Sequence, residues 1–258
     1  VFAEKINRER YASAERAKVQ HALTVIRDAL EVNLTSDIQL VRGLVGVIAL
    51  TPDLDQSRFE TAASSLFSGP TQLRSIALAP GLVIRLVYPK IGNEKVIGVA
   101  YRDLPGQFAS VEQARVTRQI VVAGPLNLVQ GGTGLVARLP VYLPGKDGQE
   151  YFWGVISAVI DVAKLYASSG LLDEKLPIEI AIRGKDAKGP AGEVFFGQSE
   201  LFANAPVLAD IHLPHGAWQI AAIPQGGWSV EPDNLWPLRL GFALIALLVL
   251  GPFLALGR

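Results

Sequence analysis

The sequence predicts an α+β fold in which a long N-terminal helix is followed by two antiparallel sheet units in tandem and then by a C-terminal transmembrane helix. Three observations lead to this fold class. The first fifty residues show helical periodicity, the chain from Ile76 onward alternates in short β-branched runs, and the last segment is apolar on every face. With 258 residues and 50% hydrophobic composition, the chain can bury one large core or two modest ones.

The N-terminal helix is predicted from apolar residues that recur at steps of three and four. These residues are Ile6, Ala12, Val19, Leu23, Ile26, Leu30, Leu34, Ile38, Val41 and Val45. A break is expected near 33–35. A helix of this length needs a partner face, which is its own domain, a twin helix, or both. Thr51-Pro52-Asp53 should end it and start a second helix over 57–66, because Pro fits a first helical turn and Thr or Asp can cap one.

The first sheet unit is predicted from β-branched runs separated by Gly and Pro. Its expected strands are 75–80, 82–89, 95–101, 126–130, 135–143 and 151–160. A helix is expected over 112–121, with Gly124-Pro125 ending it. Helices segregated from one antiparallel sheet are typical of an α+β unit.

The same plan restarts after Leu176. Two hairpins are expected, from 178–184 with 192–197 and from 209–214 with 217–224. The predicted organisation is therefore a stalk helix over 1–50, a membrane-distal ligand-binding unit over 51–170, a membrane-proximal unit over 171–235 and a transmembrane helix over 236–258.

The predicted span rests on 240–257, which contains no charged residue and has the length that crosses a bilayer as a helix. Trp236 lies at its near edge, and Arg239 and Arg258 bracket it. A buried core helix is the alternative. Since the chain opens at Val1 inside a helix and contains no methionine, we expect a preceding segment, and also a cytoplasmic part after the span.

Composition removes several function classes. Lys+Arg and Asp+Glu both number 24, so no net charge attracts nucleic acid, and none is expected as a partner. The absence of cysteine excludes disulfides, cysteine-ligated zinc and thiol catalysis. Three histidines and no recognisable catalytic arrangement disfavour an enzyme, and no cofactor or metal is expected.

The order and spacing of five segments resemble a CHASE domain, the extracellular or periplasmic ligand sensor of receptor histidine kinases and of bacterial cyclic-di-GMP enzymes. The segments are Tyr88-Pro89, "GVAYRD" at 98–103, "QARVTR" at 113–118, "AGPLNLVQGGTGLVARLPVYL" at 123–143 and "WGVISAVIDVAKLY" at 153–166. The resemblance implies two tandem PAS-like folds on a signalling helix, with a small molecule held in the membrane-distal unit.

The resemblance also implies a receptor in the bacterial inner membrane whose sensor lies in the periplasm and which forms a homodimer through the N-terminal helix. The output module, a diguanylate cyclase, a phosphodiesterase or a histidine kinase, would lie outside this chain. Two other classes remain as alternatives. One is a membrane-anchored small-molecule binding protein that serves transport, and the other is a purely structural dimerisation stalk.

Arg138 is the residue that stands out in the predicted strand 135–143. Strand alternation places it with Val136 and Pro140 on one face, while Leu135, Ala137, Leu139 and Val141 form the core face. The planar guanidinium suits a carboxylate or phosphate, which predicts an acidic small ligand such as an amino acid or organic acid. The alternatives are a solvent-facing arginine, or one paired internally with Asp103 or Glu112.

Five other residues are ligand-binding candidates. Tyr101 would share a strand face with Asp103 and supply a hydroxyl or a ring wall. Gln107, Val129 and Tyr142 are candidates through the resemblance alone. In the plant cytokinin receptors, an adenine-binding acidic residue falls near Gln107, a threonine at Arg138 and a pocket leucine at Val129. Because Arg138 places a guanidinium where those receptors have a threonine hydroxyl, we expect a ligand other than a cytokinin.

Three further patterns have simple structural interpretations. "QGGTG" at 130–134 precedes a strand and lacks a Walker lysine, so a glycine turn is expected rather than a phosphate cradle. His212 and His215 are expected in a surface loop without a third ligand. Asp161 ends a strand where a helix begins, which predicts an N-cap.

Overall fold

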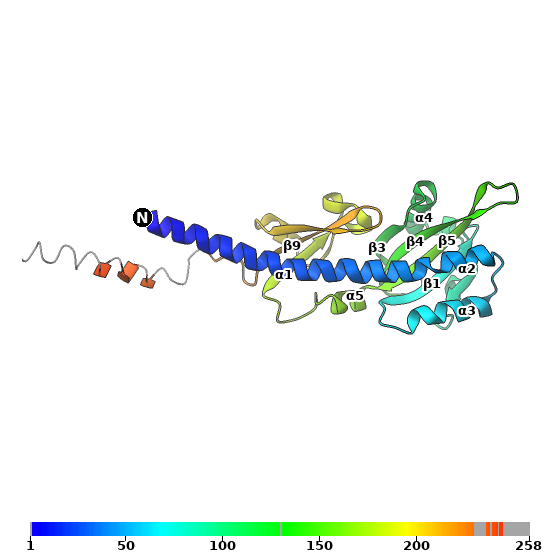
Figure 1. The fold of residues 1–258 in the computed structure, drawn as a ribbon, viewed down its shortest axis with the longest axis horizontal. Coiled ribbons are helices and arrows are strands. Elements are labelled where there is room, and N and C mark those ends of the chain that lie inside the picture. Colours follow the sequence, from blue (N-terminus) through cyan, green and yellow to red (C-terminus); the bar gives the residue numbers. More distant parts are fainter. Residues whose placement is uncertain (1, 130, 230–235, 238, 242, 245–258) are drawn as a thin grey trace, which may run out of the picture.

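A computed structural model describes residues 2–129, 131–229, 236–237, 239–241 and 243–244. Its dominant element is α1, Phe2–Arg42, which runs past both sheets and projects beyond the second (Figure 1). The break expected near 33–35 is wrong, since α1 is continuous there. Asn33 Nδ2 donates to the hydroxyls of Ser168 and Ser169, and this tertiary contact replaces any local tendency to break. The helix ends at Arg42 instead, and Gly43 separates it from α2, Leu44–Leu50.

The first sheet has the strand order β2-β1-β5-β4-β3, antiparallel throughout. Its strands are β1 Leu73–Pro80, β2 Leu86–Tyr88, β3 Val121–Asn127, β4 Thr133–Pro144 and β5 Glu150–Asp161. The helices α1, α2 and α3, Gln56–Ser64, supply buried side chains to the core on one face. The helix α4, Pro105–Thr117, packs on the other face with a separate apolar cluster (Figure 1).

Four predictions for this unit need correction. The strand expected over 95–101 is wrong: turns of 3₁₀ helix occupy Glu94–Val96 and Tyr101–Asp103, because Gly92 and Gly98 turn the chain with positive φ. The strand expected over 82–89 shrinks to β2. The helix begins at Pro105 rather than at 112, since Pro suits a first turn, and Gly124-Pro125 forms a bulge inside β3 instead of ending a helix.

The second sheet has the order β7-β6-β9-β8, and both expected hairpins are confirmed. Its strands are β6 Ile178–Arg183, β7 Val194–Phe196, β8 Val207–His212 and β9 Ala217–Pro224. The short helix α5, Val162–Ser168, connects the two sheets, and the expected N-cap is confirmed because Asp161 accepts from the Lys164 amide at 3.0 Å.

One hydrophobic core extends through both sheet units along α1. The buried residues of α1 lie on one stripe, from Val19 to Val41, and pack with inward residues of both sheets. Among the described residues, the run Phe2–Leu50 is the one helix long and apolar enough to cross a membrane, and a third of its most apolar window is buried in the protein. The predicted span over 240–257 lies largely outside the described residues.

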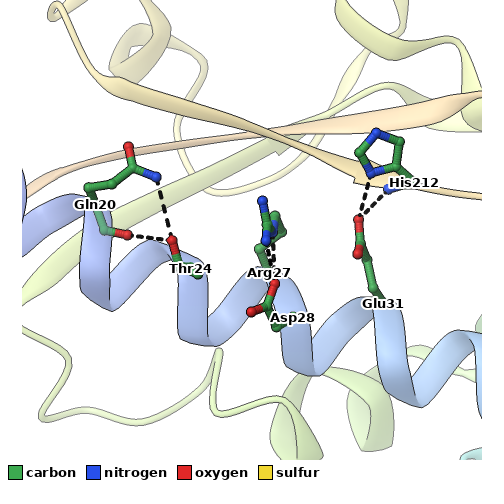
Figure 2. Close-up of polar contacts among 6 residues, drawn as sticks. All are labelled: Gln20, Thr24, Arg27, Asp28, Glu31 and His212. Carbon is green, nitrogen blue, oxygen red and sulfur yellow. Dashed lines mark hydrogen bonds and ion pairs between the residues drawn. The ribbon is translucent and has the colours of Figure 1, made fainter.

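Polar contacts also attach α1 to the second sheet. Glu31 accepts from the backbone amide of His212 at 2.6 Å and lies 3.1 Å from its Nδ1 (Figure 2). His215 lies apart from that contact, where its Nδ1 is 2.8 Å from Gln119 Oε1. The two histidines therefore connect different pairs of elements, and the described residues contain no group of three or more His, Asp or Glu side chains placed to hold a metal.

Candidate functional site

Arg138 lies in the middle of β4, between β3 and β5, on the face covered by α4. Its backbone is paired with Val121 on β3 and with Ser157 on β5. The predicted alternation is confirmed, because the neighbours Ala137 and Leu139 point to the core shared with α1. Arg138 itself is only 1% exposed. It is therefore not a solvent-facing strand arginine.

The guanidinium of Arg138 is held by neutral groups. Nη1 donates to the Tyr101 hydroxyl at 2.9 Å and to Ser157 Oγ at 2.8 Å, and those two hydroxyl oxygens are 2.6 Å apart. Nη2 donates to Gln107 Oε1 at 2.6 Å. The Tyr101 ring also stacks against the cation, with Cζ 4.7 Å from the ring centroid. Nε has no hydrogen-bond partner among the described residues.

A buried cation without a counter-ion is the central electrostatic feature of this site. None of the ion pairs formed among the described residues includes Arg138, so internal pairing with Asp103 or Glu112 is wrong: Asp103 is exposed, and Glu112 is paired with Arg115 on α4. Burial lowers the pKa of Arg138, while the adjacent Tyr101 hydroxyl opposes that shift. A guanidinium stays protonated in proteins, so the full charge faces an apolar interior.

The guanidinium lines a small cavity of about 30 Å³ beneath α4, enough for about one water molecule. Its polar lining is Ser75, Tyr101, Gln107, Arg138 and Ser157, and its apolar lining is Ala77, Ile84, Val87, Val96, Val99, Leu104, Leu128, Val129, Val136 and Val159. A second hollow of about 350 Å³ lies outside it and is open to the surface. Four residues line both: Leu104, Gln107, Leu128 and Val129.

The structure brings together four of the six predicted site residues. Arg138, Tyr101, Gln107 and Val129 all line the inner cavity. Asp103 does not, because the chain there is a 3₁₀ turn and not a strand, so Tyr101 and Asp103 do not share a face. Tyr142 follows a register shift in β4, and its hydroxyl donates to the Arg115 carbonyl at 2.6 Å, away from the cavity lining.

Sequence reasoning missed Ser157. A signal was present, since Ser157 is a polar residue at an alternate position in the apolar run 151–160. Its position directly across from Arg138 depends on the β4–β5 register, which the turn over 145–148 sets.

The model of the CHASE domain family matches residues 33–196, more than half of the chain. The chain belongs to the CHASE domain family. Ligand sensing outside the cytoplasm, which the sequence resemblance predicts, is thereby confirmed at the level of the family, and the family is one of sensors rather than catalysts. The matched range begins within α1 and ends at the last residue of β7, so it includes the whole first sheet and the Arg138 cavity.

Solved structures share the fold of this CHASE chain. An extracellular ligand binding receptor from Desulfohalobium retbaense is 18% identical with a TM-score of 0.62, over 80% of this chain, which spans 40% of that receptor. The ligand-binding domain of the Pseudomonas aeruginosa amino acid chemoreceptor PctC, in complex with GABA, is 16% identical with a TM-score of 0.54, over 77% of this chain and 95% of that one.

The ligand-binding domain of the chemoreceptor PctB from the same organism, in complex with L-Gln, is 14% identical with a TM-score of 0.53, over 88% of this chain and 98% of that one. No curated protein matches the chain in sequence. These likenesses establish the fold, while the chemistry of the cavity has to be argued from its own residues.

Proposed function

We propose that this chain is the periplasmic sensing region of an inner-membrane receptor that binds a small carboxylate-bearing molecule at Arg138 and signals to a cytoplasmic output module. The observation that carries the proposal is the buried guanidinium of Arg138, whose partners are neutral and whose Nε has no hydrogen-bond partner among the residues that the structure describes. An unpaired buried charge is costly to the fold, so a bound anion would return a large part of that cost as binding free energy.

The chemistry of the cavity favours a carboxylate. The Nε–Nη2 edge of a guanidinium matches the two oxygens of a carboxylate, and in Arg138 Nε is free. The apolar walls around it suit an aliphatic or aromatic remainder. The ligands named for PctC and PctB, GABA and L-Gln, both carry a carboxylate, which agrees with an amino acid or organic acid here.

The proposed route of the signal is α1. This helix contributes to the core of both sheets, so a change at the first sheet can reach the membrane-proximal unit through one rigid element. Arg239, which precedes the proposed span in the sequence, donates from Nε to Glu4 Oε1 at 2.8 Å, and this contact supports a proposal in which the span and the first turn of α1 are close together. The two-domain division at residue 170 and the PAS-like character of each sheet unit belong to this proposal.

The proposed receptor is a homodimer through α1. Outside its buried stripe, α1 exposes Val25, Val32 and Leu40, with exposed fractions of 56%, 62% and 42%. Val25 and Val32 are separated by one heptad, a spacing that suits a parallel twin helix. We expect Val32→Glu to convert a dimer into a monomer, as judged by analytical ultracentrifugation, while Gln39→Glu, an exposed position one heptad on without an apolar side chain, leaves it dimeric.

The test of the ligand is a thermal-shift screen of the chain in detergent against amino acids, organic acids, nucleobases and polyamines. We expect a carboxylate-bearing compound to raise the melting temperature by roughly 3 °C or more at saturation. Arg138→Met should abolish that rise with little change in packing volume, and Arg183→Met, in the second sheet, should preserve it. A response only to neutral or cationic compounds would overturn the proposal.

A further inference from the structure

The inner cavity is too small for the ligand that its chemistry favours. Cavities that bind small molecules are usually of about 300–1,000 Å³, whereas the inner cavity measures about 30 Å³. The outer hollow of about 350 Å³ is within that range. An amino acid could therefore reach Arg138 only if the shared wall moves and the two spaces join.

Gln107 is the polar part of that wall. Its side chain extends from the first turn of α4 and places Oε1 2.6 Å from Arg138 Nη2. The start of α4 has no side-chain cap at Leu104 and has Gly106 in its first turn, so few side-chain contacts hold this turn in place. The hydrogen bond between Gln107 and Arg138 is thus a main polar tie between this turn and the sheet.

The opposite side of the wall is Leu128 and Val129, at the start of the β3–β4 connection. That connection contains Gly131 and Gly132, both with positive φ, so it turns at positions that suit glycine. Leu128 is buried, while Val129 is 41% exposed. The wall between the two spaces therefore consists of one hydrogen-bonded amide and a few apolar side chains.

We propose that Gln107 is a gate and a specificity-determining residue, whose side-chain carbonyl holds the place on Arg138 that the ligand's carboxylate takes. This inference rests on the proposed function. When the carboxylate displaces Gln107, the first turn of α4 moves away from β4, and the inner cavity joins the outer hollow. A bulky part of the ligand then occupies the outer space.

Replacement of Gln107 by a ligand group at Arg138 Nη2 favours negatively charged ligands over neutral ones. A neutral amide offers Nη2 the same kind of acceptor that Gln107 already provides, so it gains little by displacing it. A carboxylate supplies the negative charge that the guanidinium lacks among its neutral partners and a second oxygen for Nε, so it gains binding free energy from both. Gln107 thereby acts as an internal competitor that neutral analogues do not displace.

The test compares Gln107→Ala with Gln113→Ala, a matched change at an exposed glutamine on the same helix. The probes are acetate and its neutral isostere acetamide, titrated at constant ionic strength and followed by the NMR signal of Arg138 Nε–H. Because Gln107→Ala removes the competitor, we expect acetate to bind about tenfold more tightly, the effect of one hydrogen bond to a charged group. The ratio of the acetate affinity to the acetamide affinity should fall in Gln107→Ala. In Gln113→Ala, both affinities should match those of the wild type.

A second measurement needs no ligand. The hydrogen on Arg138 Nε should exchange with solvent faster in Gln107→Ala than in the wild type or in Gln113→Ala, because the wall is open. Equal exchange rates in all three proteins would overturn the gate. Weaker acetate binding in Gln107→Ala would also overturn it, by showing that Gln107 contacts the ligand, yet would leave the proposed function intact. If acetate and every other carboxylate fail to bind even the opened Gln107→Ala protein, the proposed function itself is wrong.

Discussion

Each sheet of this CHASE chain holds a strand arginine in a similar set of contacts, but only one of them is left incomplete. In the second sheet, Arg183 on β6 stacks over Phe202, with Cζ 4.3 Å from the ring centroid. Gln219 Oε1 accepts from both its Nε, at 3.1 Å, and its Nη2, at 2.6 Å. In the first sheet, Arg138 stacks over Tyr101, and Gln107 takes Nη2 alone.

The difference separates a structural arginine from one poised to bind. Arg183 is half-buried and its Nε–Nη2 edge is filled, and Gln219 also donates to the Asp210 carboxylate at 3.3 Å. Arg138 is fully buried, and within the part of the chain that the structure describes its Nε has no hydrogen-bond partner and the groups bonded to its other nitrogens are neutral. Ring stacking and a hydrogen bond to a glutamine carbonyl are therefore common to both sites. The ligand site is distinguished by the Nε of Arg138, which lacks a partner among the described residues, and by the neutral character of the groups around that guanidinium.

The largest expected effect comes from supplying the missing counter-ion. Gln107→Glu should raise the melting temperature by roughly 5 °C near pH 7, because it pairs a buried and uncompensated cation. Gln219→Glu, the equivalent change beside Arg183, should change the melting temperature little, since Arg183 is only half-buried and Gln219 already contacts the Asp210 carboxylate. Calorimetry of both variants compares the two sites directly. If Gln107→Glu lowers the melting temperature, the guanidinium is already satisfied by its neutral partners.

An effect of comparable size and opposite sign is expected from removing one neutral partner. Tyr101→Phe keeps the stacked ring but removes the hydroxyl that accepts from Arg138 Nη1 and contacts Ser157. We expect a loss of about 2 kcal/mol in the free energy of unfolding, as for a hydrogen bond to a buried charged group. Gln219→Ala should cost under about 1 kcal/mol, because water can replace the amide at Arg183. Chemical denaturation measures both, and equal losses would remove the distinction between the two sites.

The Tyr101 contact also shows where sequence reasoning ends. Periodicity predicts α1, β4 and β5 and assigns Arg138 to a face, because helix and strand periods are local properties. Burial of that face depends on α4 and the 3₁₀ turn at Tyr101–Asp103 folding over it, which is set by long-range packing. The bulge at Gly124-Pro125 and the register that brings Ser157 opposite Arg138 are likewise tertiary features. The sequence therefore shows that a charged residue, Arg138, lies in this strand, but not that its guanidinium is buried among neutral groups.

An acidic side chain of α1 contacts each sheet unit, and these two contacts differ in burial, as the two arginines do. At the first sheet, Asp37 is 1% exposed and accepts from the Thr71 hydroxyl at 2.6 Å and the Gln72 amide at 3.2 Å. Burial raises the pKa of Asp37, opposed in part by those two hydrogen bonds. Its stabilising contribution is therefore complete below the ordinary aspartate pKa and is lost as pH rises through the raised one.

Asp37→Asn should accordingly match the wild type in stability at low pH and exceed it at neutral pH. An amide can still accept from Gln72 and donate to Thr71, so the contacts persist without the charge. Melting curves of both proteins between about pH 3 and pH 8 measure the difference, which should open just above the ordinary aspartate pKa of about 3.9. A constant difference across that range would show that Asp37 is not responsible for the dependence.

The smallest effect is expected at the other junction, where Glu31 and His212 meet in an exposed position (Figure 2). Glu31→Gln keeps an acceptor for the His212 amide and should change stability by less than about 0.5 kcal/mol. Glu31→Ala removes the acceptor, so the His212 amide should exchange its hydrogen faster while amides in the first sheet stay unchanged. Hydrogen exchange followed by mass spectrometry distinguishes the two variants. Should exchange in β4 and β5 rise as well, α1 would join the two sheets more tightly than these separate junctions indicate, and the second sheet would be part of the binding equilibrium at Arg138.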